Sequence, residues 1–307
     1  MSLEVDLLLD RRRLKRRLIF WRVLAVLAVV VAMIVALHAA GLKPGGGRVA
    51  RVTVKGLITE DRKVTEALDK LADDDNVKAV ILAVDSPGGS VEGGESLHAA
   101  IQRVNEKKPV VTVMGGLAAS AGYMISAPTT RIFARESTLT GSIGVLLQTG
   151  EASNLLSKVG ISTQVIKSGP LKDEPNFFTP LPADAKKMLQ GLVDDMYDQF
   201  VQIVARGRKL DPEKVRELAD GRPYTGRQAL ALGLVDAIGG EREARAWLDK
   251  EKGIATTLPV DDVSPNDLSK WTIGGQLAPL VDGLWKSVIS QSLSLDAPWA
   301  IWQRPGN

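Results

Sequence analysis

Residues 77–90 read VKAVILAVDSPGGS, an apolar run that ends in a turn rich in glycine. An almost continuous apolar run of this kind predicts a strand that is buried on both faces, as in a parallel sheet covered by helices. A helical stretch follows at 91–104, and similar strand-like runs lie at 49–56 and 109–115. Buried strands that alternate with crossover helices predict an α/β fold with a largely parallel sheet.

The rest of the chain between 57 and 240 continues this alternation. We expect further helices at 64–71, 182–206 and 211–221, and short strands at 131–134, 142–147 and 162–168. Apolar side chains at helical spacing indicate the long helix, and Asp211 before Pro212 is a typical helix start.

Residues 18–40 form an apolar segment of 23 residues in which Arg22 is the only charged side chain at pH 7. At about 1.5 Å per residue it is long enough to cross a hydrocarbon core of roughly 30 Å. The basic residues within 1–17 predict that the N-terminus stays in the cytoplasm and that the rest lies outside. We therefore expect a single-pass anchor in the cytoplasmic (inner) membrane, with a cleaved secretory signal as the alternative.

These features divide the chain into five parts. We expect a cytoplasmic basic segment at 1–17, the anchor at 18–40, a hinge rich in glycine at 41–48, a folded domain at 49–255 and an amphipathic extension rich in tryptophan at 256–307. The extension either packs against protein or contacts the membrane surface.

Composition excludes several classes of function. The formal charge is +3, but residues 1–22 hold seven Lys/Arg and three acidic residues, so the remainder carries −1. The basic surplus beside the anchor fits anionic lipid, and we expect no nucleic-acid partner. The chain has no cysteine, which excludes disulfides and thiolate metal sites. We expect neither a metal nor a cofactor.

Two glycine-rich elements follow strands and could carry chemistry. Residues 115–126 read GGLAASAGYMIS and place Ser120 at a strand-to-helix junction, where backbone amides can approach a ligand. Residues 85–91 read DSPGGSV, and the amide of Gly88 or Gly89 could stabilise an oxyanion. Each element taken alone is also an ordinary turn with a helix cap.

The candidates for a general base are few. The two histidines are His38, at the end of the apolar segment, and His98, on a predicted helix. A Ser/His/Asp triad would depend on His98 alone, and a surface histidine is the simpler interpretation. Lys172 follows a Gly-Pro turn, and an ordinary lysine is a solvated surface charge unless its site is desolvated.

Five ordered motifs together resemble the signal peptide peptidase A family of serine proteases. They are DSPGGS, GGLAASAGYMIS, GSIGV, SGPLKDE and RPYTGRQALALGLVDAIG, within 49–247. The resemblance implies an α/β Clp protease/crotonase-like fold, which here would follow an N-terminal transmembrane helix. It makes 49–255 a serine/lysine protease domain.

The resemblance also implies roles for individual residues. Ser120 would be the nucleophile, Lys172 the general base and Ser142 the residue that orients the lysine. Backbone amides of Gly88 or Gly89 and of Ser120 would hold the oxyanion. The family often has glycine after the nucleophile, where this chain has Ala121.

The implied substrates are hydrophobic peptides such as released signal peptides. Single-unit members of the family form homo-oligomeric rings in which adjacent subunits share the serine and lysine. The alternatives are an inactive oligomeric membrane scaffold of the same fold and a crotonase-type acyl-CoA enzyme.

Overall fold

The computed structural model describes residues 17, 20–29, 31–33, 35–36 and 47–263. The chain divides into two compact units, one of which is Gly47–Pro265. The strands of this unit are β1 (Arg48–Ile58), β2 (Val77–Gly89), β3 (Val110–Ala119), β4 (Arg131–Ala134), β5 (Leu139–Gly141), β6 (Pro223–Thr225), β7 (Ala237–Ile238) and β8 (Val260–Val263). Its helices are α2 (Arg62–Asp73), α3 (Val91–Lys107), α4 (Ala121–Ser126), α5 (Ser153–Lys158), α6 (Ala183–Arg208), α7 (Pro212–Leu218), α8 (Gly226–Ala231) and α9 (Glu241–Lys252).

The strands form one mixed sheet in the order β6-β5-β3-β2-β1-β8, with β4 beside β3 and β7 beside β4. All pairs are parallel except β5 with β6. The sequence-based expectation of a largely parallel α/β sheet is therefore confirmed. Strand β3 pairs with β4 through its first half and with β5 through its last residues, so the sheet branches beside the end of β3.

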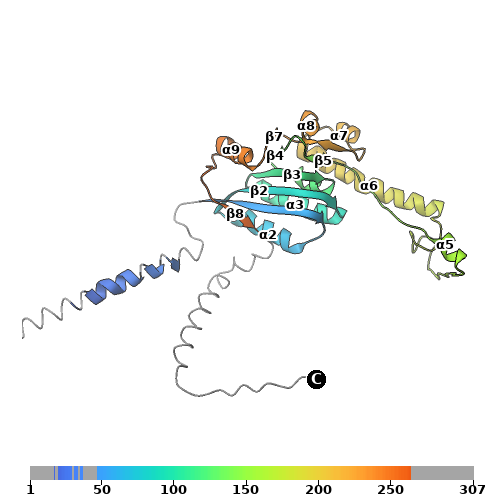
Figure 1. The fold of residues 1–307 in the computed structure, drawn as a ribbon, viewed down its shortest axis with the longest axis horizontal. Coiled ribbons are helices and arrows are strands. Elements are labelled where there is room, and N and C mark those ends of the chain that lie inside the picture. The colour runs from blue at the N-terminus through green and yellow to red at the C-terminus, as the bar shows by residue number, and fades with distance from the viewer. Residues whose placement is uncertain (1–16, 18–19, 30, 34, 37–46, 264–307) are drawn as a thin grey trace, which may run out of the picture. The chain divides into compact units, whose positions relative to one another are not determined.

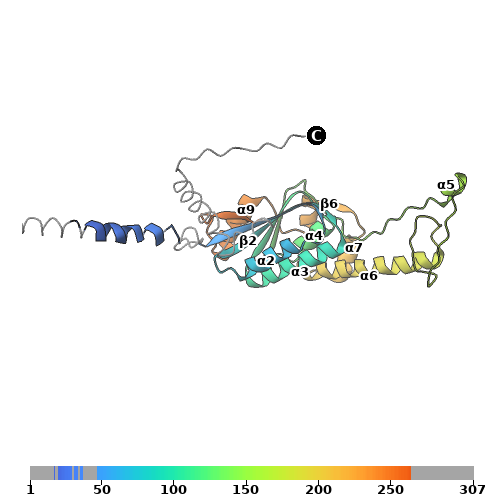
Figure 2. The ribbon, with the colours of Figure 1, turned by 90° about the horizontal axis from the view of Figure 1, so that it is seen from below.

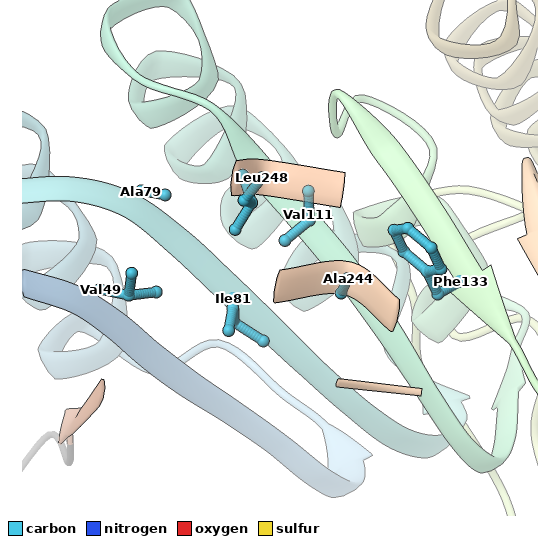
Figure 3. Close-up of a cluster of buried hydrophobic side chains, with 7 residues drawn as sticks. All are labelled: Val49, Ala79, Ile81, Val111, Phe133, Ala244 and Leu248. Atoms are coloured by element: carbon cyan, nitrogen blue, oxygen red, sulfur yellow. The ribbon is translucent and has the colours of Figure 1, made fainter. Parts of the chain in front are cut away.

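Helices cover both faces of the sheet. Helices α2 and α3 lie on one face and α9 lies on the other (Figure 2). On the α9 face, Ala244 and Leu248 pack on Ile81, Val111 and other strand residues (Figure 3). Side chains alternate between the faces of a strand, so the apolar run of β2 supplies both cores.

Two predicted strands are absent from the described sheet. Residues 142–147 follow β5 without strand structure, and residues 162–168 form no regular element and are exposed throughout. Apolar β-branched residues such as Val165 and Ile166 favour strands, but no neighbouring strand pairs with them. The prediction of strands there was wrong because pairing, which local sequence does not reveal, is what makes a strand.

Residues 145–182 form a segment that protrudes from the sheet, and we call it the protruding segment. Figures 1 and 2 show α5 at the end of α6 that is remote from the sheet. Helix α6 has 26 residues, about 39 Å of length at 1.5 Å per residue. Five of its seven buried residues lie between Phe200 and Ala205, and the other two are Ala185 and Leu189, whereas Leu192 is 49% exposed.

The predicted anchor lies largely outside what the structure tests. The described residues between 20 and 36 are helical and exposed, and 18–19, 30, 34 and 37–40 are outside the described residues. Among the described residues, no helix meets the length and hydropathy that a membrane crossing requires. The anchor stays a prediction, and so does the extension, of which 264–307 is outside the described residues. Strand β8, however, pairs with β1 and lies beyond the predicted domain boundary at 255.

Candidate active site

Ser120 lies where β3 ends and α4 begins. Its backbone has φ 53° and ψ −123°, a combination that is strained for a residue with a side chain. The Ser120 amide donates to the carbonyl of Gly141, and the Ser120 carbonyl accepts from the amides of Tyr123 and Met124, all at 2.9 Å. Hydrogen bonds on both sides therefore hold the strained turn and fix the direction of the serine side chain.

The turn opens into a groove of about 660 Å³. The groove is lined by Leu57, Ile58, Thr59, Pro87, Gly88, Gly89, Ser90, Val91, Ser120, Ser142, Gly144, Val145, Leu146 and Gly221. None of these residues is ionisable. The groove thus offers an uncharged, partly apolar surface beside a serine hydroxyl.

Gly88 packs directly against Ser120. A Cβ atom at Gly88 would lie 2.7 Å from the Ser120 Cβ and 3.1 Å from both the Ser120 Oγ and the Ala121 amide nitrogen. Its φ of +111° is also one that side chains rarely adopt. Glycine is required here for both reasons, and the predicted oxyanion element does lie beside Ser120.

Ser142 reaches the same groove from β5. Ala119 pairs with Gly141 across β3 and β5, so the residues that follow them, Ser120 and Ser142, leave the sheet side by side. Gly141 has φ +74° and Ser142 has φ +48°, and the Ser142 amide donates to the Arg222 carbonyl at 3.0 Å. The fold thus brings together Ser120, Ser142, Gly88 and Gly89, which are far apart in sequence.

The amides at this site have partners that sequence does not reveal. The Gly88 amide donates to Oγ of the fully buried Ser86 at 3.1 Å, and the Ser120 amide donates to Gly141. Either amide would have to leave its present acceptor to bind an oxyanion. Ala121 stands at the first position of α4, and the first amides of a helix have no acceptor within the helix. The Ala121 amide next to Gly88 is a donor that the sequence analysis missed, although the helix start at Ser120 was a usable signal.

Lys172 is not brought to Ser120 within one chain. It lies in the protruding segment, is exposed, and is not among the residues that line the groove. Its amide donates to the Gly169 carbonyl at 3.2 Å, within a turn. Nearby, Lys167 forms a 3.1 Å ion pair with the buried carboxylate of Glu174.

His98 does not line the groove either. It is half-buried on α3, and burial together with the nearby charge of Arg206 lowers its pKa to about 4. His98 is thus neutral near pH 7 and faces α6, while His38 is outside the described residues. Within the described part of the chain, no cluster of His, Asp or Glu could hold a metal ion.

Comparison with known proteins supplies the family. The model of peptidase family S49 matches residues 102–255, half of the chain. A candidate protease of Synechocystis sp. is 40% identical over 242 residues, which cover 77% of this chain and 87% of that protein. The chain belongs to peptidase family S49.

Two further relatives carry more specific names. A candidate signal peptide peptidase SppA of Enterococcus faecium is 41% identical over 69% of this chain and 62% of its own length. Protease 4 of Salmonella typhi is 40% identical over 56% of this chain and 28% of its own length. The chain therefore spans only part of these two relatives. The predicted resemblance to the signal peptide peptidase A family is confirmed.

The part of the chain that matches the S49 model contains most of the candidate site residues. It includes Ser120, Ser142 and Lys172. A second model, for Clp protease, matches residues 50–151 and includes Gly88, Gly89, Ser120 and Ser142. The predicted Clp protease-like α/β fold is confirmed by this match and by the observed sheet. The roles of the individual site residues stay predictions.

Proposed function

We propose that this S49 chain is a membrane-anchored serine endopeptidase that uses Ser120 as nucleophile and Lys172 as general base. The observation that carries the proposal is the strained turn that directs Ser120 into an uncharged groove beside Gly88. A serine on such a turn is exposed to substrate while its backbone is held by hydrogen bonds.

The proposed chemistry is acyl transfer in two steps. The neutral lysine amine takes the proton from Oγ of Ser120 as Oγ attacks the peptide carbonyl. The amide of Ala121, with that of Gly88 or Gly89, donates to the developing oxyanion. The lysine then returns the proton to the leaving amine, and water hydrolyses the acyl-enzyme. Ser142, on the neighbouring turn, accepts from the lysine and orients it.

The groove supports hydrophobic peptides as substrates. Its lining has no ionisable residue, so a charged substrate side chain would lose water without gaining a partner. Released signal peptides fit this chemistry. Ala121 and Met124, which flank Ser120 in sequence, are buried and do not line the groove. The surface comes instead from Leu57, Val145 and Leu146.

We further infer that a second copy of this chain supplies Lys172. The protruding segment carries the lysine away from its own sheet (Figure 1). Its apolar side chains are unusually exposed for a soluble surface, including Leu155 at 63%, Val159 at 63% and Ile166 fully exposed. A head-to-tail contact that repeats and closes makes a ring, so a homo-oligomeric ring would cover these side chains and complete each site.

Anchoring by residues 18–40 would place the catalytic domain on the outer side of the cytoplasmic membrane. The support is the length of the apolar segment and the basic residues before it. Since the chain has no cysteine, Lys250→Cys, at an exposed position on α9, introduces a unique thiol. Its labelling by an impermeant maleimide in intact spheroplasts tests the orientation, and protection of the thiol until lysis would contradict it.

Covalent labelling tests the catalytic pair. We expect a peptide phosphonate to modify the full-length protein at Ser120, as found by mass spectrometry of the labelled peptide. Ser120→Ala and Lys172→Ala should both abolish labelling, because one removes the nucleophile and the other the group that activates it. Lys158→Ala is the matched control, since Lys158 is another exposed lysine of the protruding segment.

The outcomes separate the proposal from its alternatives. Absence of labelling in a folded wild-type oligomer would indicate an inactive scaffold. Labelling that survives in Lys172→Ala but not in Ser120→Ala would keep the nucleophile and reject the base. Equal peptidase activity in wild type and Ser120→Ala would reject the serine mechanism.

A further inference from the structure

Leu57 is an exposed leucine beside the catalytic groove. Its side chain lies at the end of β1 and is 76% exposed, whereas its neighbour Ile58 is 3% exposed. A leucine so exposed at the mouth of a groove has no role in the core of its own chain. Its position therefore calls for another explanation.

An irregularity in the sheet sets the direction of Leu57. Lys55 pairs with Asp85 but Leu57 pairs with Gly88, so β2 advances three residues while β1 advances two. Gly56, between them, has φ +76°, and a Cβ there would meet nothing within 4 Å. Backbone conformation rather than space thus requires this glycine. Bulges beside active sites commonly redirect a side chain, and this one accompanies an exposed leucine.

Leu57 lies between two hollows. It lines the catalytic groove with Ser120, and it also lines a second pocket of about 170 Å³ between β1, α2 and α3. The two share Leu57, Ile58 and Thr59. The second pocket adds polar and charged groups, among them Lys55 and Asp61. An extended peptide that leaves Ser120 in this direction would cross Leu57 before it reaches polar surroundings.

We propose that Leu57 is a specificity-determining residue, whose side chain contacts an apolar side chain of the peptide substrate a few residues from the cleaved bond. This inference rests on the proposed function. A contact of two apolar side chains removes both from water, and the peptide is the occupant because the surface is continuous with the catalytic groove. A charge at position 57 would then select the opposite charge in the substrate.

A change of specificity tests this role. Leu57→Glu and the control Leu230→Glu, on α8 where Leu230 is 39% exposed, are assayed as full-length oligomers. The substrates are quenched peptides in which each position near the cleaved bond is leucine or lysine. At one position we expect Leu57→Glu to lower kcat/KM for the leucine peptide and raise it for the lysine peptide, each by about tenfold. Leu230→Glu should retain the wild-type preference.

Three other results would overturn the inference. If Leu57→Glu cleaves with wild-type selectivity while a small phosphonate still labels its Ser120, Leu57 does not contact substrate. If selectivity is unchanged and the oligomer dissociates, Leu57 is a contact between copies. If wild type itself is neither labelled nor active, the proposed function fails and this inference fails with it.

Discussion

At the scale of single residues, the site depends on close packing between the end of β2 and the turn at Ser120. Gly88 and Ser120 both have positive φ, and they meet at distances that leave no room for a methyl group on Gly88. The hydroxyl of Ser86 accepts from the Gly88 amide at 3.1 Å and donates to the Gly88 carbonyl oxygen at 3.3 Å. These two hydrogen bonds fix the backbone conformation of Gly88. Positions of the reacting groups are therefore set by backbone conformation as much as by side chains.

Gly88→Ala should abolish activity without unfolding the domain. The added Cβ would lie 2.7 Å from the Ser120 Cβ. Alanine would also have to keep the positive φ of Gly88, and a backbone strained in this way costs of order 1–3 kcal/mol. We expect at least a hundredfold slower phosphonate labelling and a lower melting temperature with the far-UV circular dichroism of the folded state. A wild-type labelling rate in Gly88→Ala would contradict this packing.

Gly191→Ala is the matched control for this substitution. Gly191 lies inside α6, where a Cβ would meet nothing within 4 Å. Alanine is favoured over glycine in a helix by about 0.5–1 kcal/mol. This variant should therefore be as active as wild type and equally or more stable.

At the scale of elements, α6 links the protruding segment to the core. Its C-terminal Arg208 forms a 2.6 Å ion pair with Asp236, whose carboxylate also accepts from the Ile132 amide at 2.7 Å. Arg206, two residues before the end of α6, lies near enough to His98 on α3 for its charge to lower the pKa of His98. In α4, the buried Tyr123 hydroxyl donates to the Leu234 carbonyl at 2.8 Å. The nucleophile helix and the end of α6 thus both depend on the loop at 232–236.

The contact between α3 and α6 should make stability depend on pH. Burial and Arg206 lower the pKa of His98 from 6.5 to about 4, so the folded state favours the neutral imidazole. The contribution of neutral His98 to the free energy of unfolding is therefore complete above pH 6.5, and it is lost as the pH falls from 6.5 toward 4. After a discount for the exposed part of the side chain, the loss is about 2 kcal/mol.

Urea unfolding of wild type and His98→Gln at pH 7.0 and pH 4.5 measures this contribution. The free energy of unfolding should fall more for wild type than for His98→Gln, because glutamine does not titrate. Carboxylates affect both proteins alike, so the comparison isolates the histidine. Equal falls in the two proteins would show that His98 titrates normally.

At the scale of the whole molecule, one chain does not assemble the proposed catalytic pair. Ser120 lines a groove at the end of the sheet, while Lys172 is exposed on the protruding segment. Leu192 in the N-terminal half of α6 and the unpaired stretch at 161–168 are likewise exposed. Contact with an adjacent copy would explain these features together.

Mixing two inactive variants tests a shared site. Full-length Ser120→Ala and Lys172→Ala are each expected to be inactive, but subunits exchanged between them would pair an intact serine with an intact lysine. Random assembly makes such a pairing at about a quarter of the interfaces of a head-to-tail ring. We therefore expect about a quarter of the wild-type labelling after mixing and reassembly. Complete inactivity of verified mixed oligomers would show that each chain uses its own lysine.

Local patterns in the sequence were enough for strands β1, β2 and β3, for helices α3 and α6, and for the turn at Ser120, whereas the predicted turn at Gly88 is the end of β2, which pairs with β1. Apolar periodicity and glycine act through neighbours in the chain, so their effects can be read without the fold. A place for Ser142 in the site was predicted only from the family resemblance. The pairing of β3 with β5 gives the physical reason why Ser142 lies near Ser120.

Only the folded chain decides which groups meet. The Ser86 hydroxyl occupies the Gly88 amide, Leu57 turns toward the groove at a bulge, and the stretch at 162–168 is not a strand. Each outcome depends on a partner distant in sequence or on its absence, because hydrogen bonds and burial are satisfied in space. For the same reason the nucleophile could be located from its local turn, whereas the base could not be placed beside it.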